Sequence, residues 1–190
     1  AEVVKTALIS NVEIYNSLRS EYATAGSDRV ARAARRAAME KQRIADLDPK
    51  EQGLRRILNF GHTAGHAFES LAARRHAEDS GFPVLAHGEA VAHGMLTALM
   101  LSAIHAGLDP RHIEEYRNDI LEHHYNPLPF DADDIPQLVE LMGHDKKNSA
   151  YGLPSFVLLS APGEPVAGIT VEPEDIASIL SKQLQPRASR

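Results

Sequence analysis

The sequence predicts a mainly α, multi-helical domain with a small β-hairpin near the C-terminus. Apolar residues recur at helical spacing along most of the chain. Combinations of residues that begin helices stand between these apolar series. Only Ser155 to Ser160 and Val166 to Val171 have the composition of strands, and Pro162-Gly163 between them indicates a turn.

The N-terminal third is expected to contain helices separated by short breaks. Ser10 followed by Glu13 resembles a capping box, which predicts a break near Ser10. Ser27-Asp28 can cap a long helix from Arg29 to Ala45. Asp48-Pro49-Lys50-Glu51 combines an N-cap, a proline at the first helical position and an acidic first turn, so another helix is predicted to begin there.

The remainder of the chain is expected to pack around one apolar helix. Gly88 to Ala106 is apolar on broad faces and is predicted to form the centre of the core. Arg74 to Leu85 is polar and interrupted by glycine and proline, which predicts a loop. Further helices are predicted over Gly61 to Ala72, Pro110 to His124, Asp134 to Met142 and Ile176 to Leu184.

Composition narrows the possible function classes. The chain has 190 residues, enough for one domain with a core of its own. Twenty basic and 26 acidic residues give a net charge of −6, which argues against a nucleic-acid binder. The absence of cysteine excludes disulfides, thiolate metal sites and cysteine nucleophiles, and it fits a reducing cytoplasm. Any metal must therefore be held by nitrogen and oxygen, for which ten histidines are available.

Neither a signal peptide nor a membrane span is expected. The chain begins inside an apparent helix and without an initiator methionine, which suggests a fragment of a longer protein. Its most apolar stretch, Ala90 to Ile104, is too short to cross a bilayer.

The densest cluster of polar residues surrounds two histidines. His62 and His66 are four residues apart, so on a helix they share a face and could approach one ion. The zinc-protease pattern requires glutamate directly after the first histidine, where Thr63 stands, so that interpretation fails. Arg55 and Asn59, also four apart, lie about one turn earlier and suit a phosphate or carboxylate. The alternative is that the two histidines are ordinary polar residues of a helix surface.

Three other clusters have simpler alternatives. His87, at the expected N-terminus of the apolar helix, could supply a further metal ligand or could only cap that helix. Glu2 and Lys5, three apart, could form an ordinary surface ion pair, and Glu51 with Arg55 could do the same. The basic turn around Lys146 could be a solvated loop.

Five segments of the chain resemble segments of the C-terminal domain of 3-dehydroquinate synthase, and they occur in the same order along the sequence as in that family. The two specific ones are Leu58-Asn59-Phe60-Gly61-His62-Thr63-Ala64-Gly65-His66 and His87-Gly88-Glu89-Ala90-Val91. The three supporting ones are Ala1-Glu2-Val3-Val4-Lys5, Glu51-Gln52-Gly53-Leu54-Arg55 and Asp145-Lys146-Lys147. The segment between His66 and His87 is longer than in many members of the family.

The resemblance implies a fold, a reaction and a domain organisation. The family converts 3-deoxy-D-arabino-heptulosonate 7-phosphate into 3-dehydroquinate and phosphate in the shikimate pathway, using transient NAD redox and a divalent metal. Residues 1–190 would form the helical metal- and substrate-binding domain, and the N-terminal NAD-binding domain would be absent from this chain. A cytoplasmic homodimer is implied for the whole enzyme, and the isolated chain is expected to be inactive.

The resemblance also implies a role for each matching residue. Glu2, His62 and His87 match the ligands of Zn²⁺ or Co²⁺, whereas His66 matches a residue that handles protons at the substrate. Glu51 matches a proton acceptor. The matching substrate contacts are Lys5, Lys41, Arg55, Asn59 and Lys146, with Lys147 left open as an alternative to Lys146.

Other functions are also possible on the sequence. Related sugar-phosphate cyclases, which make 2-deoxy-scyllo-inosose or epi-valiolone, use the same metal and NAD and differ in their substrate contacts. A glycerol-dehydrogenase-like protein is a more distant relative that lacks this phosphate-binding set. Outside the enzymes, the chain could be a non-catalytic helical module that binds metal or a partner.

Overall fold

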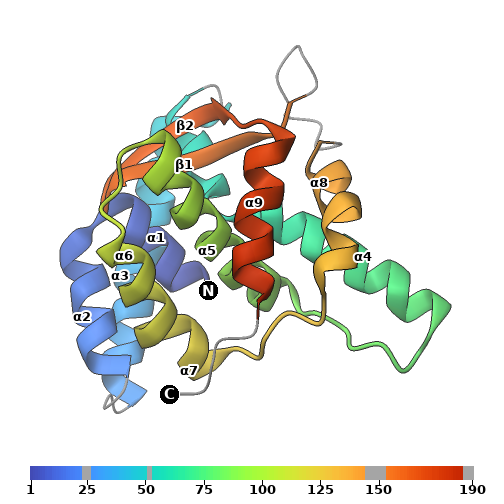
Figure 1. The fold of residues 1–190 in the computed structure, drawn as a ribbon. Helices are drawn as coiled ribbons and strands as arrows, with labels where there is room; N and C mark the ends of the chain where they lie inside the picture. Colours follow the sequence, from blue (N-terminus) through green and yellow to red (C-terminus); the bar gives the residue numbers. More distant parts are fainter. Residues whose placement is uncertain (23–26, 51–52, 144–152, 186–190) are drawn as a thin grey trace.

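The computed structural model describes residues 1–22, 27–50, 53–143 and 153–185, and it is mainly helical with one β-hairpin, as predicted (Figure 1). Within these ranges no helix is both long enough and apolar enough to cross a membrane. In chain order the elements are α1 (Glu2–Ser10), α2 (Val12–Tyr22), α3 (Ser27–Leu47), the 3₁₀ helix η1 (Leu54–Asn59), α4 (His62–Glu78), α5 (His87–His105), α6 (Arg111–Tyr116), the π-helical turn η2 (Arg117–Leu121), α7 (Glu122–His124), the 3₁₀ helix η3 (Ala132–Asp134), α8 (Ile135–Gly143), β1 (Ser155–Ala161), β2 (Glu164–Thr170) and α9 (Pro173–Leu184).

Helix α5 forms the centre of the core, as its apolar sequence predicts. Every residue from Ala90 to Ser102 is buried. Helices α4, α6 and α9 and strand β1 pack directly against α5, and α1 to α3 form a separate group at the left of Figure 1. A helix that is hydrophobic on all sides must be covered on all sides, which explains its position.

The break between the first two helices is confirmed, but the predicted capping residue is wrong. Asn11, not Ser10, caps α2, because its Oδ1 accepts a hydrogen bond from the Ile14 N–H at 3.0 Å. The Ser10 hydroxyl instead donates to the Thr6 carbonyl at 2.6 Å, back along its own helix. Serine and asparagine both suit the cap position, so residue type alone does not decide between them.

No helix begins at Asp48-Pro49, contrary to the prediction. The Asp48 carboxylate accepts hydrogen bonds from the backbone N–H groups of Gly53 at 2.8 Å and Arg55 at 3.0 Å. It therefore caps η1 several residues later, and the local cap signal belongs to a longer turn. Glu51 lies outside the described residues.

The loop predicted from Arg74 to Leu85 is shorter than expected. Helix α4 continues to Glu78, and the polar residues of its last turns are exposed or half-buried. A helix whose terminal turns lie in water carries no apolar stripe there, so its sequence resembles a loop.

The β-hairpin is confirmed and is attached to both helical groups. Strands β1 and β2 pair antiparallel, and Gly163 in the turn adopts φ +89°. Its N–H donates to the Leu8 carbonyl of α1 at 2.7 Å. Strand β1 is the buried strand and packs on α5, whereas β2 alternates between half-buried and exposed residues.

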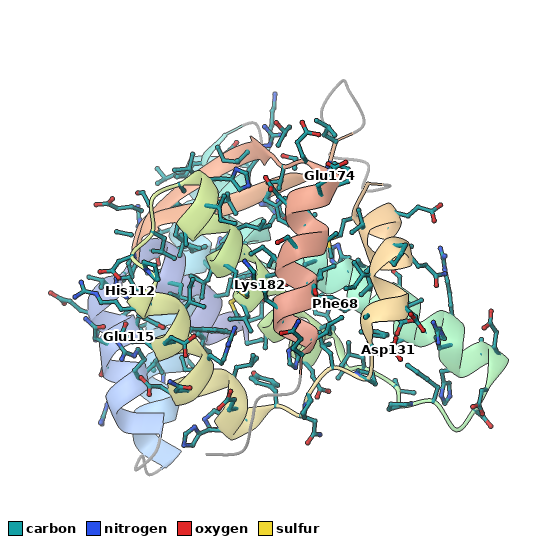
Figure 2. The ribbon with its side chains drawn as sticks, in the orientation of Figure 1. Phe68, His112, Glu115, Asp131, Glu174 and Lys182 are labelled. Carbon is teal, nitrogen blue, oxygen red and sulfur yellow. The ribbon has the colours of Figure 1, made fainter. Side chains whose placement is uncertain are left out.

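Charged side chains join α2 to α6 and η2. Arg19 lies 2.9 Å from Glu115 and 2.8 Å from Asp119. The His112 ring also contacts Glu115 at 2.8 Å, and both residues are labelled on α6 in Figure 2. This network holds the N-terminal helices against the rest of the chain.

We expect Ser102→Ala to lower the free energy of unfolding by about 1–3 kcal/mol. The buried Ser102 hydroxyl donates to the Ala98 carbonyl at 2.6 Å and accepts the Leu159 N–H of β1 at 2.9 Å. Alanine would leave that buried N–H without a partner. Urea unfolding measures the change, and the exposed Ser178→Ala serves as the control. Equal stabilities of the two variants would show that this bond does not hold β1 on α5.

Candidate functional site

The predicted site residues come from five helical elements that meet at one end of α5. Glu2 and Lys5 lie on α1, Lys41 on α3, Arg55 and Asn59 on η1, His62 and His66 on α4, and His87 on α5. Lys146, like Glu51, lies outside the described residues.

The three histidines lie together. The ring centres of His62 and His66 are 5.4 Å apart, those of His62 and His87 5.6 Å, and those of His66 and His87 6.0 Å. His87 is the first residue of α5, and the N-cap is Ala86, so His87 does not cap its helix. The fold therefore brings together two sequence clusters whose facing residues, His66 and His87, are 21 positions apart in the chain.

Close contact between α4 and α5 brings these rings together. A Cβ on Gly94 would lie 2.0 Å from the Gly61 carbonyl oxygen and 2.7 Å from the Gly65 nitrogen. Gly61 itself adopts φ +75°, a conformation that suits glycine, and directly precedes α4. The backbones thus touch where α4 begins, and its first two turns face the start of α5.

Glu2 supplies a carboxylate to this cluster. Its Oε1 lies 3.9 Å from His62 Nε2. Lys41 Nζ donates to Oε2 at 2.8 Å, and Lys5 Nζ lies 2.7 Å from Oε1. Burial opposes ionisation of Glu2, but Lys41 and Lys5 outweigh that effect and lower its pKa to about 2. The carboxylate is therefore charged at neutral pH.

Lys5 is buried, with 2% of its side chain exposed. Burial lowers its pKa, and the attraction of Glu2 opposes that shift. Its ammonium therefore depends on the Glu2 carboxylate for compensation of its charge. The ion pair is part of the cluster and not a solvated surface pair, which answers the alternative raised by the sequence.

Hydrogen bonds hold two of the three rings in place. His62 Nδ1 lies 3.2 Å from the Phe60 carbonyl oxygen, and His87 Nδ1 lies 3.0 Å from Glu69 Oε2. Both contacts leave Nε2 available. Burial, and then the Lys5 charge, lower the pKa of His62 to about 4, so this ring is neutral at pH 7. Within the described residues the His66 ring has no such hydrogen bond.

The donor set fits a divalent ion such as Zn²⁺. Neutral imidazoles held through Nδ1 and an ionised carboxylate are its usual nitrogen and oxygen ligands. Glu2 Oε1 is buried and has no hydrogen bond of good geometry in the described part of the chain, although Lys5 lies close to it. The atoms do not yet surround one point, since no three acidic or histidine side chains among the described residues are placed to hold an ion. To bind an ion together with the histidines, the Glu2 carboxylate would have to give up its contacts with Lys5 and Lys41.

A small cavity of about 70 Å³ adjoins the histidines. Its lining includes Asn59, His62, His66 and Arg56, but not Arg55. Arg55 instead extends toward the Pro49 carbonyl, with Nη1 at 3.4 Å. The prediction assumed α-helical spacing, whereas in a 3₁₀ helix residues three apart share a face and residues four apart do not.

A larger cavity, about 520 Å³, shares no lining residue with the small one. It is lined by residues of α5, η2, α7, the segment after α7 and the end of α9, among them Leu96, Tyr125, Phe130 and Lys182. None of the predicted site residues that the structure describes lines it. The volume of a cavity alone therefore does not indicate where the predicted site residues lie.

A family model described as 3-dehydroquinate synthase C-terminal matches residues 1–148. The chain belongs to this family. The 3-dehydroquinate synthase of Parabacteroides distasonis is 39% identical over 181 residues, which are 95% of this chain and 49% of that protein. The enzyme of the same name from Leptospira interrogans is 35% identical over 187 residues, 96% of this chain and 48% of that protein. The chain thus spans about half the length of these curated relatives of the 3-dehydroquinate synthase family.

Two solved structures share the fold of this chain. A 2-epi-5-epi-valiolone synthase from Streptomyces hygroscopicus, with NAD⁺ and Zn²⁺ bound, matches with a TM-score of 0.72 and 22% identity over 96% of this chain and 49% of that one. A 2-deoxy-scyllo-inosose synthase complexed with carbaglucose-6-phosphate, NAD⁺ and Co²⁺ matches with a TM-score of 0.69 and 23% identity over 96% of this chain and 50% of that one.

Two residues beside the candidate site are not predicted by the sequence analysis. Arg56 lines the small cavity together with Asn59, three residues later, and α-helical spacing does not predict this because η1 is a 3₁₀ helix. Glu69 was missed because its contact, His87, is 18 residues away in the chain. A signal for Glu69 was present, since it follows His66 by three residues on the same helix.

Proposed function

We propose that this chain is the metal- and substrate-binding half of a 3-dehydroquinate synthase, which converts 3-deoxy-D-arabino-heptulosonate 7-phosphate into 3-dehydroquinate and phosphate. The observation that supports it most is the convergence of His62, His87 and the ionised Glu2 from three separate helices. The relatives that are 39% and 35% identical carry that enzyme's name. The solved cyclases, at 22–23% identity, support the fold only.

The proposed metal ligands are Glu2, His62 and His87. A divalent ion held there, Zn²⁺ or Co²⁺, would supply a Lewis acid to the hydroxyl groups of the substrate. His62 is suited to this role because it is neutral at pH 7 and its Nδ1 is already held by the Phe60 carbonyl. Three protein ligands would leave positions open for substrate.

The proposed substrate contacts are cationic or amide side chains around these ligands. Lys5 and Lys41 both contact Glu2, so a cation binding to Glu2 would release their ammonium groups toward an anionic sugar phosphate. Asn59 and His66 line the small cavity, and Arg56 adds a guanidinium there.

The remaining proposed roles come from the segments that match the family. Arg55 and Lys146 are proposed substrate contacts, and Glu51 is the proposed proton acceptor. His66 is proposed to move a proton at the substrate, which its exposed position beside the cavity permits.

The chain is proposed to act with an NAD-binding domain that lies outside it. The support is that the matched relatives are about twice as long and that the solved cyclases of this fold hold NAD⁺. Without that domain no hydride acceptor is held, so residues 1–190 alone with added NAD are expected to show no turnover. The cytoplasmic homodimer implied by the resemblance is part of the same proposal.

The substrate proposal is tested by supplying the whole protein, with NAD⁺ and Zn²⁺, with three sugar phosphates. Phosphate release is expected from 3-deoxy-D-arabino-heptulosonate 7-phosphate and not from sedoheptulose 7-phosphate or glucose 6-phosphate. Turnover of either of the latter two alone would assign the chain to another sugar-phosphate cyclase. No turnover of any of them, with metal bound, would favour a non-catalytic module.

A further inference from the structure

The two proposed histidine ligands are held by different means. His62 is mostly buried, with 16% of its side chain exposed, and its Nδ1 contacts the carbonyl of Phe60 two residues earlier. His87 is half exposed, at 50%, and lies at the very start of α5. An exposed ring in the first turn of a helix is free to rotate unless another group fixes it.

Glu69 is the group that contacts the exposed ring. Its Oε2 lies 3.0 Å from His87 Nδ1. Its place on α4 is firm, because the neighbouring residues Phe68 and Ala67 are buried. A carboxylate on a well-packed helix can therefore define the orientation of a ring on another helix.

We propose that Glu69 is a positioning residue for the metal site, acting through His87. Its carboxylate accepts the Nδ1–H of His87, which fixes the tautomer with the lone pair on Nε2 and directs that atom to the space shared with His62. A carboxylate hydrogen-bonded to the far nitrogen of a ligand histidine generally strengthens metal binding by that ring. This inference rests on the proposed metal site and adds to it a residue outside the ligand set.

The geometry separates this role from two others. A surface ion pair of half-exposed groups contributes ~0–1 kcal/mol to stability and would leave metal affinity unchanged. A direct metal ligand would need its oxygen at the ion, whereas the Glu69 oxygen is engaged on the Nδ1 side of the ring, away from Nε2. Of these three roles, only the positioning role predicts an effect of Glu69 on metal affinity that disappears when His87 is removed.

The test measures metal affinity in the whole protein that carries this chain. Zn²⁺ competition against a chromophoric chelator and titration with Co²⁺, followed by its visible absorption, are the readouts. Glu69→Gln keeps a hydrogen-bond acceptor and removes the charge, whereas Glu69→Ala removes both. We expect affinity to fall by about 10–100-fold, more in the alanine variant, with the metal-free thermal midpoint unchanged. Glu78→Gln, an exposed residue of the same helix, is the matched control and should bind as wild type does.

A double-mutant cycle separates positioning from a general effect on the fold. Glu69→Gln should have no further effect on affinity in a protein that already carries His87→Ala. Wild-type affinity in both Glu69 variants, or an undiminished effect in the His87→Ala background, would overturn the inference.

Failure of the proposed function gives a different result. If His62→Ala and His87→Ala bind Zn²⁺ as tightly as the unaltered protein, the metal site itself is wrong. If those two variants lose the metal while Glu69→Gln and Glu69→Ala retain it, only the role of Glu69 is wrong.

Discussion

Gly94→Ala is expected to be the most damaging small substitution in this fold. Its Cβ would lie 2.0 Å from the Gly61 carbonyl oxygen and 2.7 Å from the Gly65 nitrogen. These are backbone atoms, so no side-chain rotation relieves the overlap, and α4 must move away from α5. We expect a loss of free energy of unfolding at or above the upper end of the ~1–3 kcal/mol typical of overpacking. Urea unfolding of the metal-free protein measures it.

Gly88→Ala is the matched control on the same helix. A Cβ at Gly88 would meet only the Ala1 Cβ, at 3.9 Å. Since alanine favours the helix over glycine, this variant should be unchanged or more stable by up to about 1 kcal/mol. If Gly94→Ala proved as stable as Gly88→Ala, the close backbone contact between α4 and α5 would be incorrect. The approach of His62 to His87 would then lose its structural basis.

His62→Ala is expected to abolish tight metal binding, whereas His66→Ala is not. The two rings are 5.4 Å apart and are about equally far from His87, so distance does not distinguish them. The surroundings do. His62 is neutral at pH 7, is held through Nδ1 and lies 3.9 Å from Glu2, whereas His66 is exposed beside the small cavity. Loss of one of three ligands should weaken Zn²⁺ binding by at least about 100-fold.

The His66→Ala variant provides the comparison. It should bind Zn²⁺ nearly as tightly as the unaltered protein and lose turnover by about 10²–10⁴-fold, the usual contribution of a proton-transferring group. Calorimetry gives the metal affinity and phosphate release gives the rate. Equal losses of metal in both variants would make His66 a ligand, and an unaffected His62→Ala would remove His62 from the ligand set.

The elements that were predicted well are those whose signal lies within one segment. The buried helix α5 was found because its apolar residues surround it, and the hairpin because Pro162-Gly163 separates two short apolar runs. The elements that were predicted poorly depend on contacts beyond the segment. Asp48 looks like the start of a helix, yet its carboxylate is used by N–H groups five and seven residues later.

At the candidate site, too, signals within one segment differ from contacts between segments. The ligand set Glu2, His62 and His87 was proposed from a resemblance and stays a prediction, and the structure brings these side chains near one another from three helices. Residue spacing alone favoured His62 with His66, because it registers neighbours on one helix and not partners on another.

The sequence by itself determined the helical class, the central helix, the hairpin and the family, because periodicity and motifs are local properties of the chain. Only the tertiary structure decided that Arg56 and not Arg55 lines the small cavity, that Lys5 and Lys41 share Glu2, and that Glu69 holds His87. The physical reason is that these contacts depend on the conformation of η1 and on the packing of helices against one another, of α3 on α1 and of α4 on α5 at Gly94. Both are set by packing between segments and leave no pattern within either one.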